Sequence, residues 1–198
     1  MLIVVVVAPR SAGGYKAIPT KGGNYTLTYS VEYSVCNSPG GAGFNKINLT
    51  LIYRNGKLIE AETPLGSLPP SAFGFPHMLG FYDEIISLNG VLSNTTLRFD
   101  RGTISKSVIH VNNVRLIGSP YEAHNAVEIV AHVSLTNFTW PGLAMHFKFI
   151  NANYIVVKDG ITGVPVYFTG VLSDPAVRKA FGCDITTISI SAYLIDVK

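Results

Sequence analysis

The chain has 198 residues, of which 47% are apolar and only 14% are charged, whereas an average soluble domain has about 25% charged residues. The formal net charge is +3 without any run of basic residues, which argues against nucleic-acid binding. No stretch reaches the roughly 18 apolar residues of a spanning helix, so we expect no membrane span. The chain is long enough to bury a core, and its low charge indicates a surface that is either partly covered or kept soluble by other means.

The chain begins with an apolar arm made of Leu2, Ile3, Val4, Val5, Val6 and Val7. β-Branched side chains lose χ1 freedom in a helix and fit a pleated sheet, so the arm is predicted to be a strand. The arm does not alternate with polar residues, and therefore both of its faces must be covered. We treat it as part of the folded product, because it lacks the basic start and the cleavage site of a complete signal peptide.

Residues 9–23 hold four glycines and two prolines and read as a tether that spans about 50 Å when extended. Two hypotheses follow for the arm. It completes the sheet of another copy of the protein, or it pairs within its own chain after a long loop. The first hypothesis divides the chain into a donor strand and tether over residues 1–23 and a single β-sandwich domain over residues 24–198.

The first half of the domain shows one clear strand and one hairpin. Residues 25–36 alternate apolar and polar side chains without a break and predict a half-buried strand, followed by a Pro/Gly loop over residues 37–43. Strands over residues 47–53 and 57–61 flank Asn55-Gly56, a type I′ turn signal, and predict a hairpin. Residues 63–80 are rich in proline, glycine and aromatic residues and are expected to pack as a long connection across the sandwich.

From residue 84 onward, short strands recur with the spacing of about 8 to 12 residues that is typical of a β-sandwich. They are expected over residues 85–88, 97–99, 104–111, 114–117, 126–135, 145–150, 154–157, 164–171 and 185–197. One short helix is predicted over residues 174–181, with Asp174 as its N-cap and Gly182 just past its end. The expected class is therefore all-β, a jelly-roll or Ig-like β-sandwich with an N-terminal donor strand and at most one short helix.

Two cysteines, Cys36 and Cys183, lie far apart in the sequence and show no metal-binding spacing. Their even number, together with the sequons below, favours one disulfide, and two buried free thiols are the alternative. Four asparagines begin N-x-Thr sequons for N-linked glycans, namely Asn24, Asn48, Asn94 and Asn137. Attached glycans would keep a surface with so few charges soluble.

No group of residues predicts an enzyme, a cofactor or a metal site. The five histidines show neither HxH nor HExxH spacing. Asp100 and Asp159 fit turns better than catalysis, although backbone carbonyls leave a calcium-binding loop as an alternative. Trp140, Tyr121 and Phe138 would suit a sugar-stacking platform, but a single tryptophan is more often part of a core or an interface.

The plan of the chain resembles that of extracellular filament subunits assembled by donor-strand complementation. These are the archaeal pili and threads, the TasA-like matrix fibres and, more distantly, the chaperone-usher pilins. The resemblance rests on the arm over residues 2–7, the tether, the sandwich of short strands, the possible disulfide and the sequons. It implies a non-enzymatic, head-to-tail homopolymer at the cell surface that serves adhesion or biofilm formation.

Three other functions remain as alternatives. A viral coat or surface-layer sandwich would swap the same arm between neighbours in a closed shell, and a carbohydrate-binding module would stay monomeric and bind glycan. A hydrolase comes last, because it would need an acid, a base or a nucleophile in a cluster that the sequence does not supply.

Overall fold

The computed structural model describes residues 14–37, 41–64, 66–68, 87–89, 92–100, 102–140, 145–173 and 187–198, and in this part the chain is all-β with two sheets, as predicted. The large sheet contains β2 (Tyr25–Asn37), β3 (Gly41–Arg54), β4 (Lys57–Thr63), β5 (Gly66–Leu68), β6 (Thr95–Phe99), β7 (Gly102–His110), β10 (Val127–Trp140), β11 (Met145–Lys158), β12 (Pro165–Ser173) and β13 (Thr187–Val197). The small sheet contains β1 (Lys16–Ala17), β8 (Val114–Arg115) and β9 (Tyr121–Ala123).

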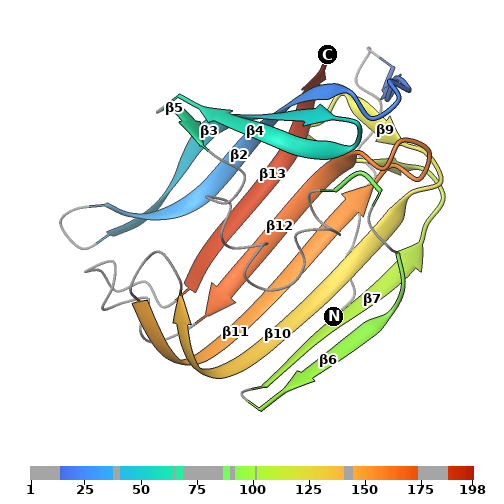
Figure 1. Ribbon diagram of the computed structural model, residues 1–198. Coiled ribbons are helices and arrows are strands. Elements are labelled where there is room, and N and C mark those ends of the chain that lie inside the picture. The colour runs from blue at the N-terminus through green and yellow to red at the C-terminus, as the bar shows by residue number, and fades with distance from the viewer. Residues whose placement is uncertain are drawn as a thin grey trace.

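The large sheet is antiparallel and strongly curved, with the order β5-β4-β3-β2-β13-β12-β11-β10-β7-β6 (Figure 1). The strands β2 to β5 form one meander and β10 to β13 form another. The pairing of β13 with β2 joins the two meanders at the centre of the sheet. The all-β, two-sheet class is thus confirmed, and the jelly-roll or Ig-like subtype stays a prediction.

One face of the large sheet, here called the core face, is apolar because the alternating strands pair in phase. Tyr25 lies opposite Tyr53, and Leu27 lies opposite Leu51, so the apolar sets of β2 and β3 share one face. The same face continues across the sheet and includes the most deeply buried side chains, among them Tyr25, Leu27, Tyr53, Ile129, Val133, Tyr154, Val156 and Leu194. The opposite face, here called the outer face, carries mostly hydroxyl and amide side chains.

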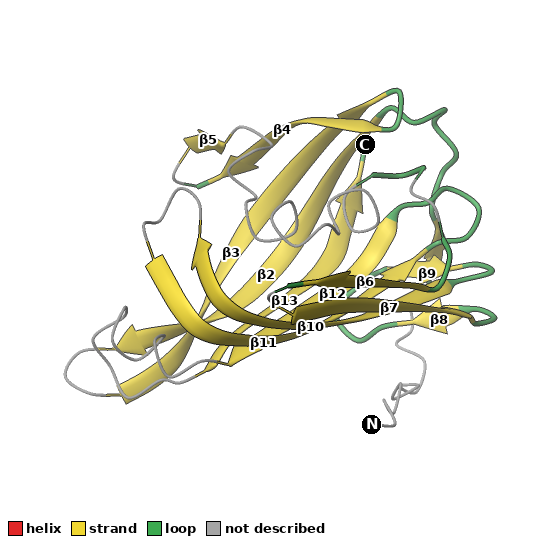
Figure 2. Cartoon of the chain, turned by 60° about the horizontal axis from the view of Figure 1, so that its bottom comes forward, coloured by secondary structure: helices red, strands yellow, loops and turns green. Residues whose placement is uncertain are grey.

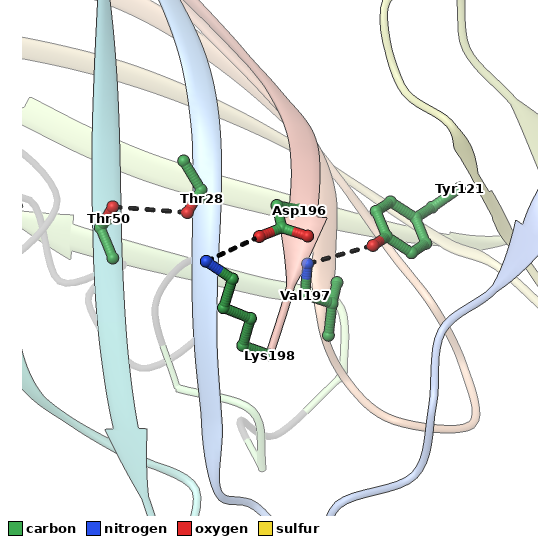
Figure 3. Close-up of polar contacts among 6 residues, drawn as sticks. All are labelled: Thr28, Thr50, Tyr121, Asp196, Val197 and Lys198. Atoms are coloured by element: carbon green, nitrogen blue, oxygen red, sulfur yellow. Dashed lines mark hydrogen bonds and ion pairs between the residues drawn. The ribbon is translucent and has the colours of Figure 1, made fainter.

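The small sheet lies near one end of the large sheet (Figure 2). The hydroxyl of Ser119 donates a 2.6 Å hydrogen bond to the carbonyl of Leu194 on β13. The Tyr121 hydroxyl accepts a 3.1 Å bond from the backbone N–H of Val197 (Figure 3). Residues 116–119, between β8 and β9, therefore pass over β13. A methyl group at Gly118 would lie 3.6 Å from the ring of Tyr193.

Two predicted turns are confirmed in detail. Asn55 and Gly56 have φ angles of 51° and 77°, as a type I′ turn requires, and they connect β3 to β4. Asp159 begins the turn from β11 to β12, and its carboxylate accepts hydrogen bonds from the backbone of His124 and Thr162.

Several predicted boundaries are wrong. Residues 145–150 and 154–157 belong to one strand, β11, because Asn151 and Asn153 continue the alternation on the outer face while Ala152 stays on the core face. The loop over residues 37–43 is shorter than expected, since β2 continues to Asn37 and β3 begins at Gly41. The strand over residues 114–117 ends at Arg115. Three short strands, β1, β5 and β9, were not predicted.

Some predictions fall on parts of the chain outside the described residues. These are the arm over residues 2–7, residues 85–86 of the strand predicted over residues 85–88, the helix over residues 174–181, Cys183 and most of the connection over residues 63–80. Residues 87–88 are described and do not form a strand, so that part of the prediction is wrong. Within the described ranges the structure contains no helix, and so none that is long and apolar enough to cross a membrane.

Candidate functional site

The large sheet ends on one side at β6, a five-residue strand that pairs with β7 and has no second neighbour among the described strands. An open strand edge presents backbone N–H and C=O groups to which another strand can pair. Leu97 of β6 lies opposite Ile104 of β7 on the core face. Ile104 is 5% exposed, whereas Leu97 is 42% exposed and Leu92, just before β6, is 38% exposed. We call this region, residues 92–99, the β6 edge.

The outer face carries a pocket of about 430 Å³ between the large sheet and residues 116–119. Its lining residues come from β3, β2, β13 and the β8–β9 connection, and they are Ser30, Glu32, Lys46, Asn48, Ile117, Gly118, Tyr193 and Ile195. In the register of the sheet, Asn48 lies opposite Ser30, and Ser30 lies opposite Tyr193. The pocket is therefore built on one row of outer-face side chains that runs across three strands.

Some polar groups of this pocket have a hydrogen-bond or ion-pair partner, and others have none among the described residues. Ser30 is only 7% exposed, and its hydroxyl has no hydrogen-bond partner among the described residues. At the rim, Lys46 and Glu32 form an ion pair at 3.3 Å. Burial raises the pKa of the Tyr193 phenol, and the nearby Tyr167 and Glu32 raise it further, so Tyr193 keeps its proton at neutral pH.

The four sequons lie in different environments. Asn24 and Asn94 use their side-chain oxygens locally, because Asn24 accepts a bond from the backbone of Asn55 and Asn94 accepts one from the backbone of Val108. Asn137 lies in β10 with a positive φ of 52°. Asn48 is exposed and lines the outer-face pocket. Occupancy of all four sites stays a prediction.

The predicted disulfide would join the end of β2 to the chain just before β13. Tyr33 of β2 lies opposite Ile190 of β13, and the register runs from there toward Cys36 on one strand and Thr187 on the other. The end of β2 therefore approaches the start of β13, which the Cys36–Cys183 pairing requires. Cys183 and the side chain of Cys36 lie outside what the structure describes.

The residues considered for catalysis, metal or sugar do not form a cluster in the described part. There, no three histidine, cysteine or carboxylate side chains come together as metal ligands. His132 is exposed and contacts Asn153 at 2.7 Å. Tyr121 is only 7% exposed, so it belongs to the core and not to a sugar-stacking surface. The side chains of Phe138 and Trp140 lie outside the described ones.

Sequence reasoning missed two buried lysines on the core face. Lys106 is 5% exposed and lies opposite Ala131, and the alternation of β7 does signal this position, because Ile104 and Val108 share its face. Lys158 is 2% exposed and donates a 2.7 Å bond to the carbonyl of Ser87. That bond joins residues 71 positions apart, so no local pattern could reveal it.

Comparisons with known proteins assign no family. No protein-family model and no curated protein matches the chain. Among solved structures, a LolA superfamily protein from Nitrosomonas europaea aligns over 91% of this chain and 88% of its own, with 6% identity and a TM-score of 0.22.

Proposed function

We propose that the chain is a non-enzymatic structural subunit of an extracellular filament that serves adhesion or biofilm formation. In this proposal, the apolar arm over residues 2–7 of one copy adds as a strand to the β6 edge of the next copy. The observation that carries the proposal is the β6 edge itself, where a strand edge without a second neighbour among the described strands coincides with exposed apolar side chains.

The β6 edge suits strand addition for two reasons. It has five residues and the arm has six, so backbone pairing can extend along the whole of β6. Leu97 lies on the apolar core face but stays 42% exposed, and a further apolar strand beside β6 would cover it. Each leucine-sized side chain that becomes buried contributes about 1.5 to 3 kcal/mol.

The start of the described chain is compatible with contact with a neighbour. Lys16–Ala17 forms β1, which pairs in parallel with β9 at the margin of the small sheet. The 13 residues that precede Gly14 span about 45 Å when extended, and a domain of this length has a radius of gyration of about 16 Å. The arm can therefore reach a second copy. A glycan on Asn94 would stand at the same edge, so the proposal requires Asn94 to be unmodified in subunits that polymerise.

The first experiment compares the intact chain with a variant that lacks residues 1–9. We expect long polymers from the intact chain in negative-stain microscopy and size-exclusion chromatography. The shortened chain should give monomers or small aggregates, because its acceptor edge stays uncovered. Closed particles of uniform size would support the coat or surface-layer alternative, and a well-behaved monomer of the intact chain would overturn strand donation.

A further inference from the structure

The outer-face pocket combines a buried, unpaired hydroxyl with a polar rim and a partly apolar lining. The Ser30 hydroxyl has no hydrogen-bond partner among the described residues although the side chain is only 7% exposed. Buried hydroxyl groups are normally hydrogen-bonded, because leaving one unpaired is unfavourable. The oxygen itself is fully buried, so rotation about χ1 would be needed to turn it toward the pocket that Ser30 lines, where a ligand would supply the missing partner.

The chemistry of the rim narrows the class of ligand. The ammonium of Lys46 and the carboxylate of Glu32 neutralise one another at 3.3 Å, so the pocket offers no surplus charge to an ion. Asn48 adds an amide that both donates and accepts hydrogen bonds. A molecule with several neutral hydroxyl groups would match this set of donors and acceptors.

Part of the pocket lining is apolar or aromatic. Ile117, in the β8–β9 connection, is 62% exposed and faces the pocket together with Ile195 and Tyr193. A pyranose ring has a C–H face that packs on apolar side chains and an equatorial set of hydroxyl groups that form hydrogen bonds. The volume of about 430 Å³ accommodates such a ring.

We propose that this pocket binds a saccharide unit through Ser30, Glu32 and Asn48, with Ile117 and Tyr193 against the sugar ring. The saccharide has two possible sources. It is the first sugar of a glycan attached to Asn48, which begins a sequon at the edge of the pocket, or it is part of a separate glycan. The site does not depend on strand donation, because no residue of the β6 edge lines it.

The first test uses the full chain produced in a host without N-glycosylation. Methyl α-glucopyranoside, methyl α-mannopyranoside and methyl β-N-acetylglucosaminide are titrated separately at millimolar concentration while the backbone amide resonances are recorded. We expect at least one of them to shift the amides of Ser30 and Gly118. Ser30→Ala should weaken this binding about 3- to 10-fold, the effect of one lost hydrogen bond, and Ser107→Ala, an exposed outer-face change on β7, should not.

A stability measurement separates a ligand-binding hydroxyl from a structural one. Ser30 and Ser119 are similarly buried, but Ser119 donates to the carbonyl of Leu194 and accepts from the N–H of Tyr121. Ser30→Ala should leave the urea midpoint unchanged or raise it, whereas Ser119→Ala should lower it. A lower midpoint for Ser30→Ala would mean that Ser30 has a structural partner, and it would overturn the proposal.

The second test uses the chain secreted from a yeast that attaches N-linked glycans. If the Asn48 glycan fills the pocket, the free methyl glycosides should no longer shift the Ser30 amide, and Thr50→Ala, which removes the sequon but keeps the Asn48 amide, should restore the shift. If only a separate glycan binds, glycosylated and unglycosylated chains should respond alike. The proposal is wrong if no methyl glycoside perturbs the unglycosylated chain and the attached glycan leaves the Ser30 and Gly118 amides unchanged.

Discussion

Asp159 illustrates how one side chain organises a junction between distant parts of the chain. The side chain is 2% exposed, and one carboxylate oxygen accepts a 2.8 Å bond from the N–H of His124. The other oxygen accepts bonds from the N–H of Thr162 at 2.8 Å and from its hydroxyl at 2.7 Å. One residue therefore fixes both the β11–β12 turn and the segment that leads into β10.

We expect Asp159→Ala to lower the free energy of unfolding by about 2 to 4 kcal/mol, because hydrogen bonds to a charged group contribute about 1.5 to 3 kcal/mol each and are only partly additive. Urea unfolding followed by far-UV circular dichroism measures this change. The matched control is Asp196→Ala, whose exposed ion pair with Lys198 at 3.4 Å should be worth less than about 1 kcal/mol (Figure 3). Equal effects of the two substitutions would contradict this account of the turn.

At the scale of single residues, the sequence predicts a role that depends on neighbouring residues in the chain better than one that depends on contacts with distant strands. The sequence predicts a turn at Asp159, because aspartate, here followed by glycine, favours turns locally. The unpaired hydroxyl of Ser30 was not predictable, since its surroundings come from β3, β13 and the β8–β9 connection. Whether a polar side chain finds a partner depends on contacts that only the fold brings together.

At the scale of the strand, the proposed function depends on the open edge at β6. Natural sheets protect such edges with short strands and with charged side chains, because charge disfavours the pairing of a further strand. β6 is short and carries Arg98, but its central core-face residue is the half-exposed Leu97. A positive charge at this position would oppose the burial of an apolar arm.

We therefore expect Leu97→Lys to abolish or strongly shorten the polymers formed by the intact chain, as measured by negative-stain microscopy and sedimentation. Because Leu97 is already exposed, the fold should lose less than about 1 kcal/mol of stability. The matched control is Ile161→Lys, a change at a 61% exposed residue in the β11–β12 turn, which should leave polymerisation intact. Polymers of normal length from Leu97→Lys would place the acceptor elsewhere.

Strands are predictable from the sequence where apolar and polar side chains alternate over many residues. The strict pattern from Tyr25 onward predicts β2 correctly, and its apolar residues lie on the core face as expected. The sequence predicts a tether where the two-residue strand β1 forms, because Lys16–Ala17 carries no alternation and gains its pairing only from β9. β11 was divided in two, because three residues around Ala152 interrupt the apolar signal although they continue the sheet.

At the scale of the whole molecule, the chain closes on itself through its first and last long strands. Ala192 and Leu194 of β13 lie opposite Val31 and Tyr29 of β2. At the end of this pairing, Thr26 and Lys198 exchange two backbone hydrogen bonds of 2.8 and 2.9 Å. The predicted Cys36–Cys183 disulfide would lock the other end of the same strand pair, so closure would not depend on the arm.

Buried tyrosines on the core face make the stability of this fold depend on pH in the alkaline range. The Tyr29 hydroxyl donates a 2.9 Å bond to the carbonyl of Pro165, and burial, with a smaller contribution from Tyr53, raises the pKa of Tyr29 well above its usual value. Burial also raises the pKa of Tyr154. Both phenols thus stay protonated in the folded state at pH values where the unfolded chain ionises them.

We expect stability to change little between about pH 7 and 9 and to fall above about pH 10, where tyrosines of the unfolded chain lose their protons. Each buried tyrosine should contribute a loss of about 1.4 kcal/mol per pH unit in that range. Urea unfolding at pH 8, 10 and 11 measures the slope. Tyr29→Phe should cost about 1 kcal/mol at pH 8 through the lost bond to Pro165 and should remove one tyrosine's share of the slope above pH 10. An unchanged slope in this variant would mean that Tyr29 ionises equally well in both states, and therefore that the core face around β2 is open to water at high pH.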